Sequence, residues 1–343
     1  MNTIAYVANA DSREISVLRL DTATGGVETL QQMPTEGDVM PLAVGPDRRV
    51  LHASIRSEPF AVQSFSIDPA SGRLALLGRA DLPASMCWIS TDRSGCFLLS
   101  ASYGSSLIAV SPVDASGVVG PAQQTAATEA NAHAVQATPD NRFLLASSLG
   151  GGVVLRYGFD AASGRFDAPG GSANASGTPA WRARPGAGPR HFVFHPSRPF
   201  VYLINELDAT IDVLAFDAAT GGLNAVQRID AMPAGIDGEP WAADIHLTPD
   251  GRFLYASERR SSTLVAFTVD ATSGRLTANG TVPTEAQPRG FAIDPSGRWL
   301  LAVGQLSTRL AVYAIDDASG RLGRRGDHPV GRNPNWVEIV DLG

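Results

Sequence analysis

One short turn sequence recurs seven times along the 343 residues of this chain. Each copy opens with aspartate, and the glycines that close the copies are Gly25, Gly72, Gly117, Gly164, Gly221, Gly274 and Gly320. An aspartate carboxylate can cap its own turn, and glycine tolerates a backbone φ above zero. Alternating apolar runs precede nearly every copy, as in residues 15–20 and 263–269. Each copy is therefore predicted to join the two outer strands of a four-stranded unit, and seven such units predict an all-β, seven-bladed β-propeller.

A second repeat supports this architecture. Tight turns that begin near residues 46, 91, 139, 196, 249 and 295 each follow an apolar strand and feed another strand. We assign the strand before the turn, strand A, to the central channel, and the strand after it is strand B. Residues 4–8 match a strand B and residues 336–340 match a strand A. The two ends are therefore predicted to pair and close the ring, which removes an exposed sheet edge.

The repeats extend along the chain, so no second domain is expected. We expect residues 1–343 to form a single propeller domain. Residues 167–188 are rich in Gly, Ala, Ser and Pro and are predicted to be a loop inserted between blades.

Composition excludes several classes of function. The net charge of -7 is spread along the chain without a basic block, so nucleic-acid binding is not expected. No apolar stretch approaches the roughly 20 residues of a membrane span, and the N-terminus lacks a basic leader. With only Cys87 and Cys96, the chain fits a reducing cytoplasm. The chain has no lysine, which excludes Schiff-base chemistry and leaves anion recognition to arginine.

The repeat also shows which positions are equivalent in successive blades, and these positions can be compared to find functional residues. The start of each strand A and the end of each strand B should lie on one rim of the channel. A purely structural repeat predicts small or apolar residues there, but several polar side chains occupy these positions instead: His133, Arg190, Glu206, Arg289, Arg56, Arg259, Tyr103 and Gln305. Propellers commonly bind ligands where loops from many blades meet, so we predict a functional mouth at this rim.

Other polar residues lie near the same strands. Asp244 and His246 alternate on one strand face and could form a polar network inside the channel, and Asp244 is kept as a candidate substrate-binding residue. His191 and His195 are expected to point elsewhere and to be structural. Glu206 could simply form an ion pair with its neighbour Arg190.

A metal site competes with this interpretation. The ligand types are present, as His133, Glu206, Asp244 and His246. However, the sequence has no short-spaced histidine pair and no acidic loop with calcium-ligand spacing. Two or three arginines on the same rim would also repel a cation, so neither a metal nor another cofactor is expected.

Several phrases of the sequence resemble a known family. They are Gly-Ala-Gly-Pro-Arg-His-Phe-Val-Phe-His-Pro at 186–196, Asn-Glu-Leu at 205–207, Trp-Ala-Ala-Asp-Ile-His-Leu-Thr-Pro-Asp-Gly-Arg at 241–252, Thr-Glu-Ala-Gln-Pro-Arg-Gly-Phe at 284–291 and Gly-Arg-Asn-Pro-Asn-Trp-Val at 331–337. In this order they resemble the seven-bladed propeller lactonase family over essentially the whole chain. The likeness is strongest to its bacterial cytoplasmic 6-phosphogluconolactonase branch.

The resemblance implies hydrolysis of 6-phospho-D-glucono-1,5-lactone to 6-phospho-D-gluconate, a step of the pentose phosphate pathway. The family also contains fungal carboxy-muconate lactonising enzymes, whose proposed active site of one His, two Arg and one Glu falls by motif on His133, Arg190, Glu206 and Arg289. Arginine donors there could stabilise an oxyanion, and either Glu206 or His133 could serve as general base.

The remaining rim residues are candidates for substrate binding. Arg56 and Arg259 are candidates for the phosphate, and Tyr103, Gln305 and Asp244 complete the set. The expected partner is a small lactone, and the chain is expected to be a monomer or homodimer.

Three other functions remain open at this point. The first is a lactonase or cycloisomerase that acts on an unphosphorylated sugar-acid lactone or a muconolactone. The second is a non-catalytic propeller that binds a protein or peptide, a class that usually shows exposed apolar patches or Trp-Asp repeats. The third is a propeller oxidoreductase, whose cofactor would absorb light beyond the aromatic band.

Overall fold

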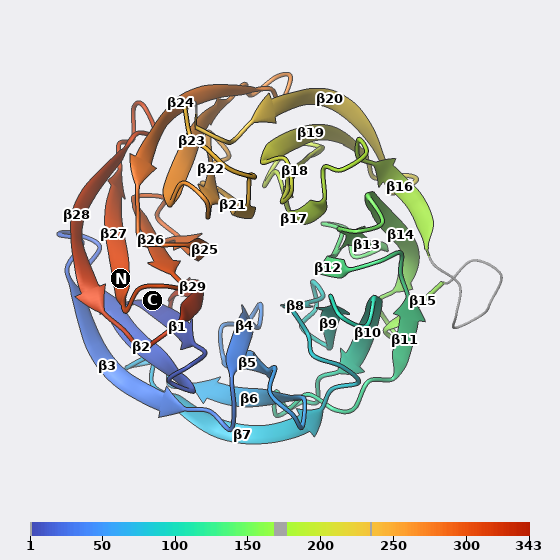
Figure 1. Ribbon diagram of the computed structural model, residues 1–343. Coiled ribbons are helices and arrows are strands. Elements are labelled where there is room, and N and C mark those ends of the chain that lie inside the picture. The colour runs from blue at the N-terminus through green and yellow to red at the C-terminus, as the bar shows by residue number, and fades with distance from the viewer. Residues whose placement is uncertain (1, 168–176, 234) are drawn as a thin grey trace.

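The computed structural model describes residues 2–167, 177–233 and 235–343, and it is a ring of seven antiparallel sheets around a central channel (Figure 1). The all-β, seven-bladed propeller prediction is confirmed. From channel to periphery, the first blade contains β29 (Pro334–Asp341), β1 (Thr3–Asn9), β2 (Glu14–Leu20) and β3 (Val27–Pro34). The second contains β4 (Val39–Val44), β5 (Val50–Ile55), β6 (Ala61–Ile67) and β7 (Leu74–Asp81). The third contains β8 (Trp88–Thr91), β9 (Phe97–Ser102), β10 (Leu107–Pro112) and β11 (Gln124–Ala127).

The fourth blade consists of β12 (Ala132–Ala137), β13 (Phe143–Ser148) and β14 (Val153–Asp160), followed by two short outer strands. These outer strands are β15 (Arg165–Phe166) and β16 (Thr178–Arg182). The fifth blade contains β17 (Pro189–Phe194), β18 (Phe200–Asn205), β19 (Thr210–Asp217) and β20 (Gly222–Asp230). The sixth contains β21 (Ala242–Leu247), β22 (Phe253–Glu258), β23 (Thr263–Val269) and β24 (Leu276–Pro283). The seventh contains β25 (Pro288–Ile293), β26 (Trp299–Gly304), β27 (Arg309–Ile315) and β28 (Leu322–Pro329).

The two ends of the chain close the ring as predicted. β1 pairs antiparallel with β29, with Val7 opposite Val337, so the first blade takes its innermost strand from the C-terminus. The described residues contain no apolar helix that could cross a membrane.

The seven hairpin glycines have a second role beyond turn geometry. All seven have φ between +67° and +87°. Each also packs against the side chain that opens strand B of the preceding blade, and a methyl group at Gly25 would collide with Trp299, as one at Gly320 would with Phe253. The glycine and the bulky residue of the second repeat are therefore two halves of one contact, which repeats around the ring.

The prediction of a loop at 167–188 is partly wrong. Residues 178–182 form β16, which pairs with β14 and completes the outer edge of the fourth blade. Residues 168–176 lie outside the described residues. β16 adds backbone hydrogen bonds to a sheet whose other outer strand, β15, has only two residues.

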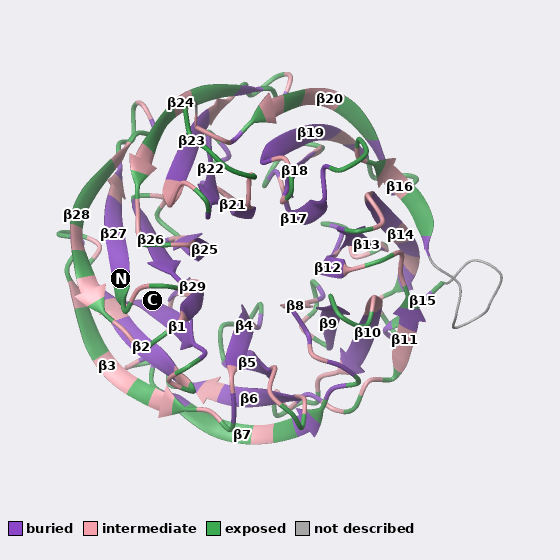
Figure 2. Cartoon of the chain, in the orientation of Figure 1, coloured by how far each residue is buried: buried purple, intermediate pink, exposed green. Residues whose placement is uncertain are grey.

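Apolar side chains fill the space between neighbouring blades. One cluster joins Tyr6 and Ile15 to Leu51 and Phe65 of the next blade. The inner three strands of each blade are mostly buried, whereas the outer strand is mostly exposed or half-buried (Figure 2). This packing makes the inner strands a fixed frame for side chains that point into the channel.

Candidate functional site

The inner strands carry bulges where they enter the channel. Pairing shifts register between Ala132 and Ala134 in β12, between Pro189 and Phe192 in β17, and between Pro288 and Gly290 in β25. A bulge bends a strand and re-aims its side chains. His133, Arg190 and Arg289 lie within these bulges, and the structure brings all three to the predicted mouth.

Glu206 is the carboxylate at the centre of the mouth. Its Oε2 accepts a hydrogen bond from Arg190 Nε at 2.7 Å and forms an ion pair with Arg259 Nη2 at 3.0 Å, and its Oε1 accepts a hydrogen bond from Trp241 Nε1 at 3.1 Å. Burial alone would raise the pKa of Glu206, but the two arginines outweigh burial and lower it. Glu206 is therefore a fixed anion with both oxygens engaged, and the ion pair with Arg190 that the sequence suggested is present.

Arg259 is held firmly on one side of the mouth. Its guanidinium carbon lies 3.9 Å from the centre of the Trp241 ring, and its Nε donates to the Trp241 carbonyl at 3.2 Å. Burial, and then the neighbouring Arg190, lower the pKa of Arg259 to about 9. This side chain contributes positive charge to the mouth from a clamped position.

Arg289 and Arg56 form the other side of the mouth and meet at one methionine. Arg289 Nε lies 3.1 Å and Arg56 Nη1 3.5 Å from Met40 Sδ, and Arg56 Nε also donates to Ser85 Oγ at 3.1 Å. Within the described part of the chain, neither arginine forms an ion pair with a carboxylate. Burial together with Arg190 and Arg259 lowers the pKa of Arg289. The mouth thus combines four arginines with Glu206 and with the buried Glu258 near Arg259, so positive charge is in excess.

His133 is buried beside this cluster. Its ring centre lies 5.9 Å from that of Tyr103, which is 38 % exposed at the rim. Burial and the positive charge of Arg190 hold the pKa of His133 well below its usual range, so the ring is neutral. Its Nδ1 has no hydrogen-bond partner among the described residues. A buried polar atom in this state indicates a place where a ligand or water atom can bind.

Two of the predicted substrate-binding residues lie away from the arginine cluster. Gln305 donates to Asn333 Oδ1 at 3.4 Å and makes no hydrogen bond to the cluster among the described residues. Asp244 lies one step deeper in the channel, where it accepts a hydrogen bond from His246 Nε2 at 3.1 Å. The predicted polar network of Asp244 and His246 is therefore confirmed.

The prediction that His191 points elsewhere is wrong. Its Nδ1 lies 2.8 Å from Asp244 Oδ1, and its Nε2 lies 3.1 Å from Arg190 Nη1. Alternation along β17 would place adjacent residues on opposite faces, but the bulge at this point turns both Arg190 and His191 into the channel. His191 also packs edge-on against Trp88 and Trp336, at ring-centre distances of 4.6 and 5.8 Å.

A cavity adjoins this aromatic layer. It has a volume of about 260 Å³, and its lining combines aromatic side chains with charged ones, namely Asp244, His246, Glu338 and Arg93. Burial raises the pKa of Glu338 to about 7, although its Oε1 accepts a hydrogen bond from Trp336 Nε1 at 2.9 Å. We refer to this chamber as the lower cavity. No group of three or more His, Cys, Asp or Glu residues in the described ranges is arranged to hold a metal ion.

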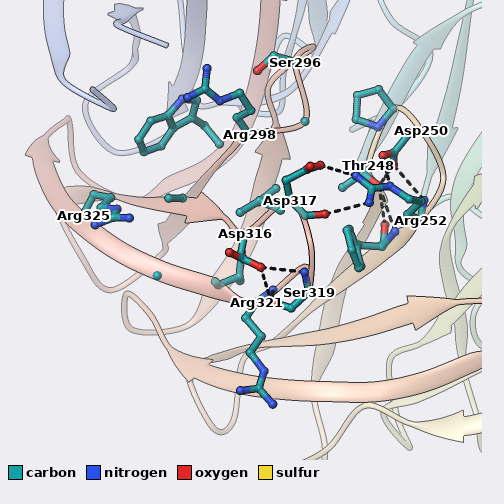
Figure 3. Close-up of a pocket in the computed structure, with 18 of the residues that line it drawn as sticks. Thr248, Asp250, Arg252, Ser296, Arg298, Asp316, Asp317, Ser319, Arg321 and Arg325 are labelled. Carbon is teal, nitrogen blue, oxygen red and sulfur yellow. Dashed lines mark hydrogen bonds and ion pairs between the residues drawn. The ribbon is translucent and has the colours of Figure 1, made fainter. Parts of the chain in front are cut away.

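A larger groove of about 1120 Å³ lies on the turn-bearing face of the propeller, between the sixth and seventh blades (Figure 3). Some of its polar groups pair with one another: Arg252 Nε donates to Asp250 at 2.6 Å, and Ser319 Oγ donates to Asp316 at 2.6 Å. The guanidinium groups of Arg298, Arg321 and Arg325 have no such partner among the described residues. These residues form the A–B turn and the Asp…Gly hairpin, so the groove follows from the repeat.

Comparison with known proteins agrees with the seven-bladed propeller fold. The chain is 41% identical over 343 residues to a 6-phosphogluconolactonase of Pectobacterium carotovorum, with all of both chains covered, and 41% identical over 341 residues to that of Serratia proteamaculans, with 99% of each covered. The solved structure of the periplasmic gluconolactonase of Pseudomonas aeruginosa superposes with a TM-score of 0.90 at 29% identity, covering 99% of this chain and 100% of the other. Residues 3–339 match the family described as Lactonase, 7-bladed beta-propeller, and the chain belongs to this family.

Proposed function

We propose that the protein is a cytoplasmic 6-phosphogluconolactonase, which hydrolyses 6-phospho-D-glucono-1,5-lactone to 6-phospho-D-gluconate. The observation that carries this proposal is the excess of arginine at the mouth, where Arg56, Arg190, Arg259 and Arg289 outnumber the carboxylates of Glu206 and the buried Glu258. A phosphorylated lactone brings a dianion, and its hydrolysis creates a further negative charge. Full-length relatives that bear this name at 41% identity support the same substrate.

The reaction needs a base, and the geometry favours His133 over Glu206. Both oxygens of Glu206 are occupied by N–H donors, and its pKa is lowered, which makes it a weak proton acceptor. His133 is neutral and its Nδ1 is unengaged by the described residues. Burial and then the arginines lower the pKa of His133, so an anionic substrate that offsets the arginine charge will raise this pKa.

The proposed step is acyl hydrolysis. A water oxygen forms a bond to the lactone carbonyl carbon while His133 takes one of the water protons. Negative charge develops on the carbonyl oxygen, where the N–H groups of Arg190 and Arg289 stabilise it. The bond from the carbonyl carbon to the ring oxygen then breaks, the ring oxygen receives the proton from His133, and the acid product ionises.

The phosphate is proposed to bind toward Arg56. Arg56 is half-buried and lacks a carboxylate partner in the described residues, whereas Arg259 already forms an ion pair with Glu206 and donates to the carbonyls of Trp241 and Ala242. Arg259 thus adds charge, and Arg56 with Arg289 offers free donors. Tyr103 at the rim is placed to cover the sugar ring.

A second candidate substrate is an unphosphorylated aldonolactone. The structural similarity to a gluconolactonase, at a TM-score of 0.90, favours it. The two substrates separate in one experiment with freshly generated 6-phosphogluconolactone and D-glucono-1,5-lactone, both followed by proton release in weak buffer. The first is also coupled to 6-phosphogluconate dehydrogenase, and a chelator is present throughout.

We expect rapid, chelator-resistant turnover of the phosphorylated lactone, with kcat/KM at least roughly 10²-fold above that of the unphosphorylated lactone, since charged hydrogen bonds to phosphate contribute 1.5–3 kcal/mol each. Equal turnover of both lactones would move the proposal to the second candidate. No acceleration of either over the spontaneous rate would overturn it.

A further inference from the structure

The residues beneath the mouth form a hydrogen-bonded series that the lactonase chemistry does not itself require. It runs from Asp244 through His191 to Arg190 and joins β21 to β17. We propose that Asp244 and His191 are positioning residues that fix the guanidinium of Arg190 for the reaction. This inference rests on the role of Arg190 in the proposed function.

Asp244 is a buried carboxylate that accepts four hydrogen bonds. Its Oδ1 accepts from His191 Nδ1 at 2.8 Å and from the Ile245 amide at 3.0 Å. Its Oδ2 accepts from His246 Nε2 at 3.1 Å and from the Phe291 amide at 3.3 Å. Burial alone would raise the pKa of Asp244, but these donors hold it well below its usual range. Asp244 is therefore ionised and can only accept hydrogen bonds.

The ionised carboxylate determines which nitrogen of His191 carries the proton. A hydrogen bond to Asp244 requires the proton on Nδ1. Burial, and then Arg190, lower the pKa of His191 to about 3, so the ring stays neutral and Nε2 keeps a lone pair. That lone pair accepts the N–H of Arg190 Nη1 at 3.1 Å. The opposite tautomer would place two N–H groups against each other.

The contacts of Arg190 hold its Nε and Nη1 in place and leave its other terminal nitrogen, Nη2, without a hydrogen-bond partner among the described residues. Its Nε donates to Glu206, and its Nη1 donates to His191 and to the Ala243 carbonyl. Its Nη2 is buried and has no partner among the described residues. Arginine has rotatable bonds that would otherwise spread its donors over several positions. With Nε and Nη1 fixed, the N–H groups of Nη2 keep a single direction before substrate arrives, as preorganised oxyanion stabilisation requires.

A purely structural role, in which His191 only plugs the channel, is the alternative. The edge-on contacts with Trp88, His133 and Trp336 are consistent with it. Two substitutions distinguish the structural role from the positioning role, because each keeps only one of the two hydrogen bonds that the His191 ring forms. In His191→Gln the amide oxygen reaches the region of Nε2 and can still accept from Arg190. In His191→Asn the amide nitrogen reaches the region of Nδ1 and can donate to Asp244, but no acceptor remains for Arg190.

We expect His191→Asn to lower kcat by roughly tenfold to 100-fold with little change in KM, and His191→Gln to retain most of the wild-type kcat, because positioned oxyanion donors contribute effects of this size. His52→Gln is the matched control. His52 is another buried histidine, hydrogen-bonded to Ser64 at 3.1 Å, and its substitution should lower the thermal midpoint without changing kcat. Equal losses in the Asn and Gln variants would overturn the proposal.

The tautomer itself is measured without substrate, by ¹⁵N imidazole NMR of the full chain. The chain has six histidines, and His191→Gln identifies the His191 signals by their loss. We expect a protonated Nδ1 and an unprotonated Nε2 between pH 5 and 8. In Asp244→Ala an Nε2-protonated form should appear. A protonated Nε2 in the wild type would refute the proposal even if lactone turnover is confirmed. Absence of turnover with the expected tautomer would instead refute the proposed function.

Discussion

The two ends of the central channel differ in their charged groups. The mouth holds Arg56, Arg190, Arg259 and Arg289 around Glu206, whereas the lower cavity mixes the acidic Asp244 and Glu338 with His246 and Arg93. Burial acts on both ends in the same sense, but the neighbours differ. At the mouth, burial and arginine lower the pKa of His133. In the lower cavity, burial alone would lower the pKa of His246, yet Asp244 outweighs it and raises the pKa.

This difference shows how one scaffold separates binding from support. The repeat provides fourteen equivalent places for side chains around the ring, two for each of the seven blades. In the proposed function, the residues at the rim form an anion site, and Asp244 and His191, one step deeper, are hydrogen-bonded to it through Arg190. Changes at the mouth should therefore alter catalysis, and changes in the lower cavity beyond Asp244 should alter stability alone.

The largest effect is expected for Arg190→Lys. Lysine keeps the positive charge but lacks the planar set of donors that contacts Glu206, His191 and the substrate together. We expect kcat/KM for the proposed substrate to fall by roughly 10³-fold, which is the upper range for loss of an oxyanion donor. Steady-state kinetics measure it, with Arg298→Gln on the exposed turn-bearing face as a control that should stay within twofold of wild type. A loss of less than fivefold would remove Arg190 from the proposed chemistry.

A smaller and more selective effect is expected for Arg56→Ala. If Arg56 binds phosphate, the KM for the phosphorylated lactone should rise by roughly tenfold to 100-fold while kcat changes little, as for loss of uniform binding through a charged hydrogen bond. The residual activity toward D-glucono-1,5-lactone should be unaffected. The same proportional loss with both lactones would show that Arg56 supports the mouth generally and does not read the phosphate.

The lower cavity should respond to pH through stability. The pKa of Glu338 is raised from 4.5 to about 7 in the folded chain. Its contribution to stability is therefore present below about pH 4.5 and is lost as the pH rises through 7. Glu338→Gln has no such proton to lose. Its free energy of unfolding relative to wild type should increase by about 2 kcal/mol between pH 5 and pH 8.

Urea unfolding of both proteins at the two pH values measures this difference, and lactone turnover of Glu338→Gln should stay within twofold of wild type. A constant difference between the two proteins across pH would mean that Glu338 is ionised normally. A large loss of turnover would mean that the lower cavity takes part in catalysis, which breaks the division between the two ends.

Much of the architecture follows from the sequence because its signals repeat. Seven Asp…Gly hairpins, the bulky residue that opens strand B, and the complementary chain ends each have a local physical cause, and they agree on one ring. The same comparison of equivalent positions predicted that His133, Arg190, Glu206 and Arg289 lie on one rim. It did so because equivalent positions in the blades face the same end of the channel.

The errors occur where a local irregularity breaks the repeat. Alternation placed His191 away from Arg190, but the bulge in β17 cannot be read from residue order. Residues 178–182 lack a strong strand pattern, yet they pair with β14 because its edge is otherwise nearly bare. Backbone pairing beside the adjoining ends of β21 and β22 places Arg259 next to Trp241, but the stacking of the guanidinium on the indole ring cannot be read from spacing.

The most direct test of the account compares one variant from each end of the channel. The rate of 6-phosphogluconolactone opening is measured for wild type, Arg190→Lys and Glu338→Gln against the spontaneous rate, in one buffer with a chelator. The account predicts strong acceleration by wild type and Glu338→Gln and its near-complete loss in Arg190→Lys. Wild type no faster than the spontaneous reaction, or equal rates in the two variants, would contradict it.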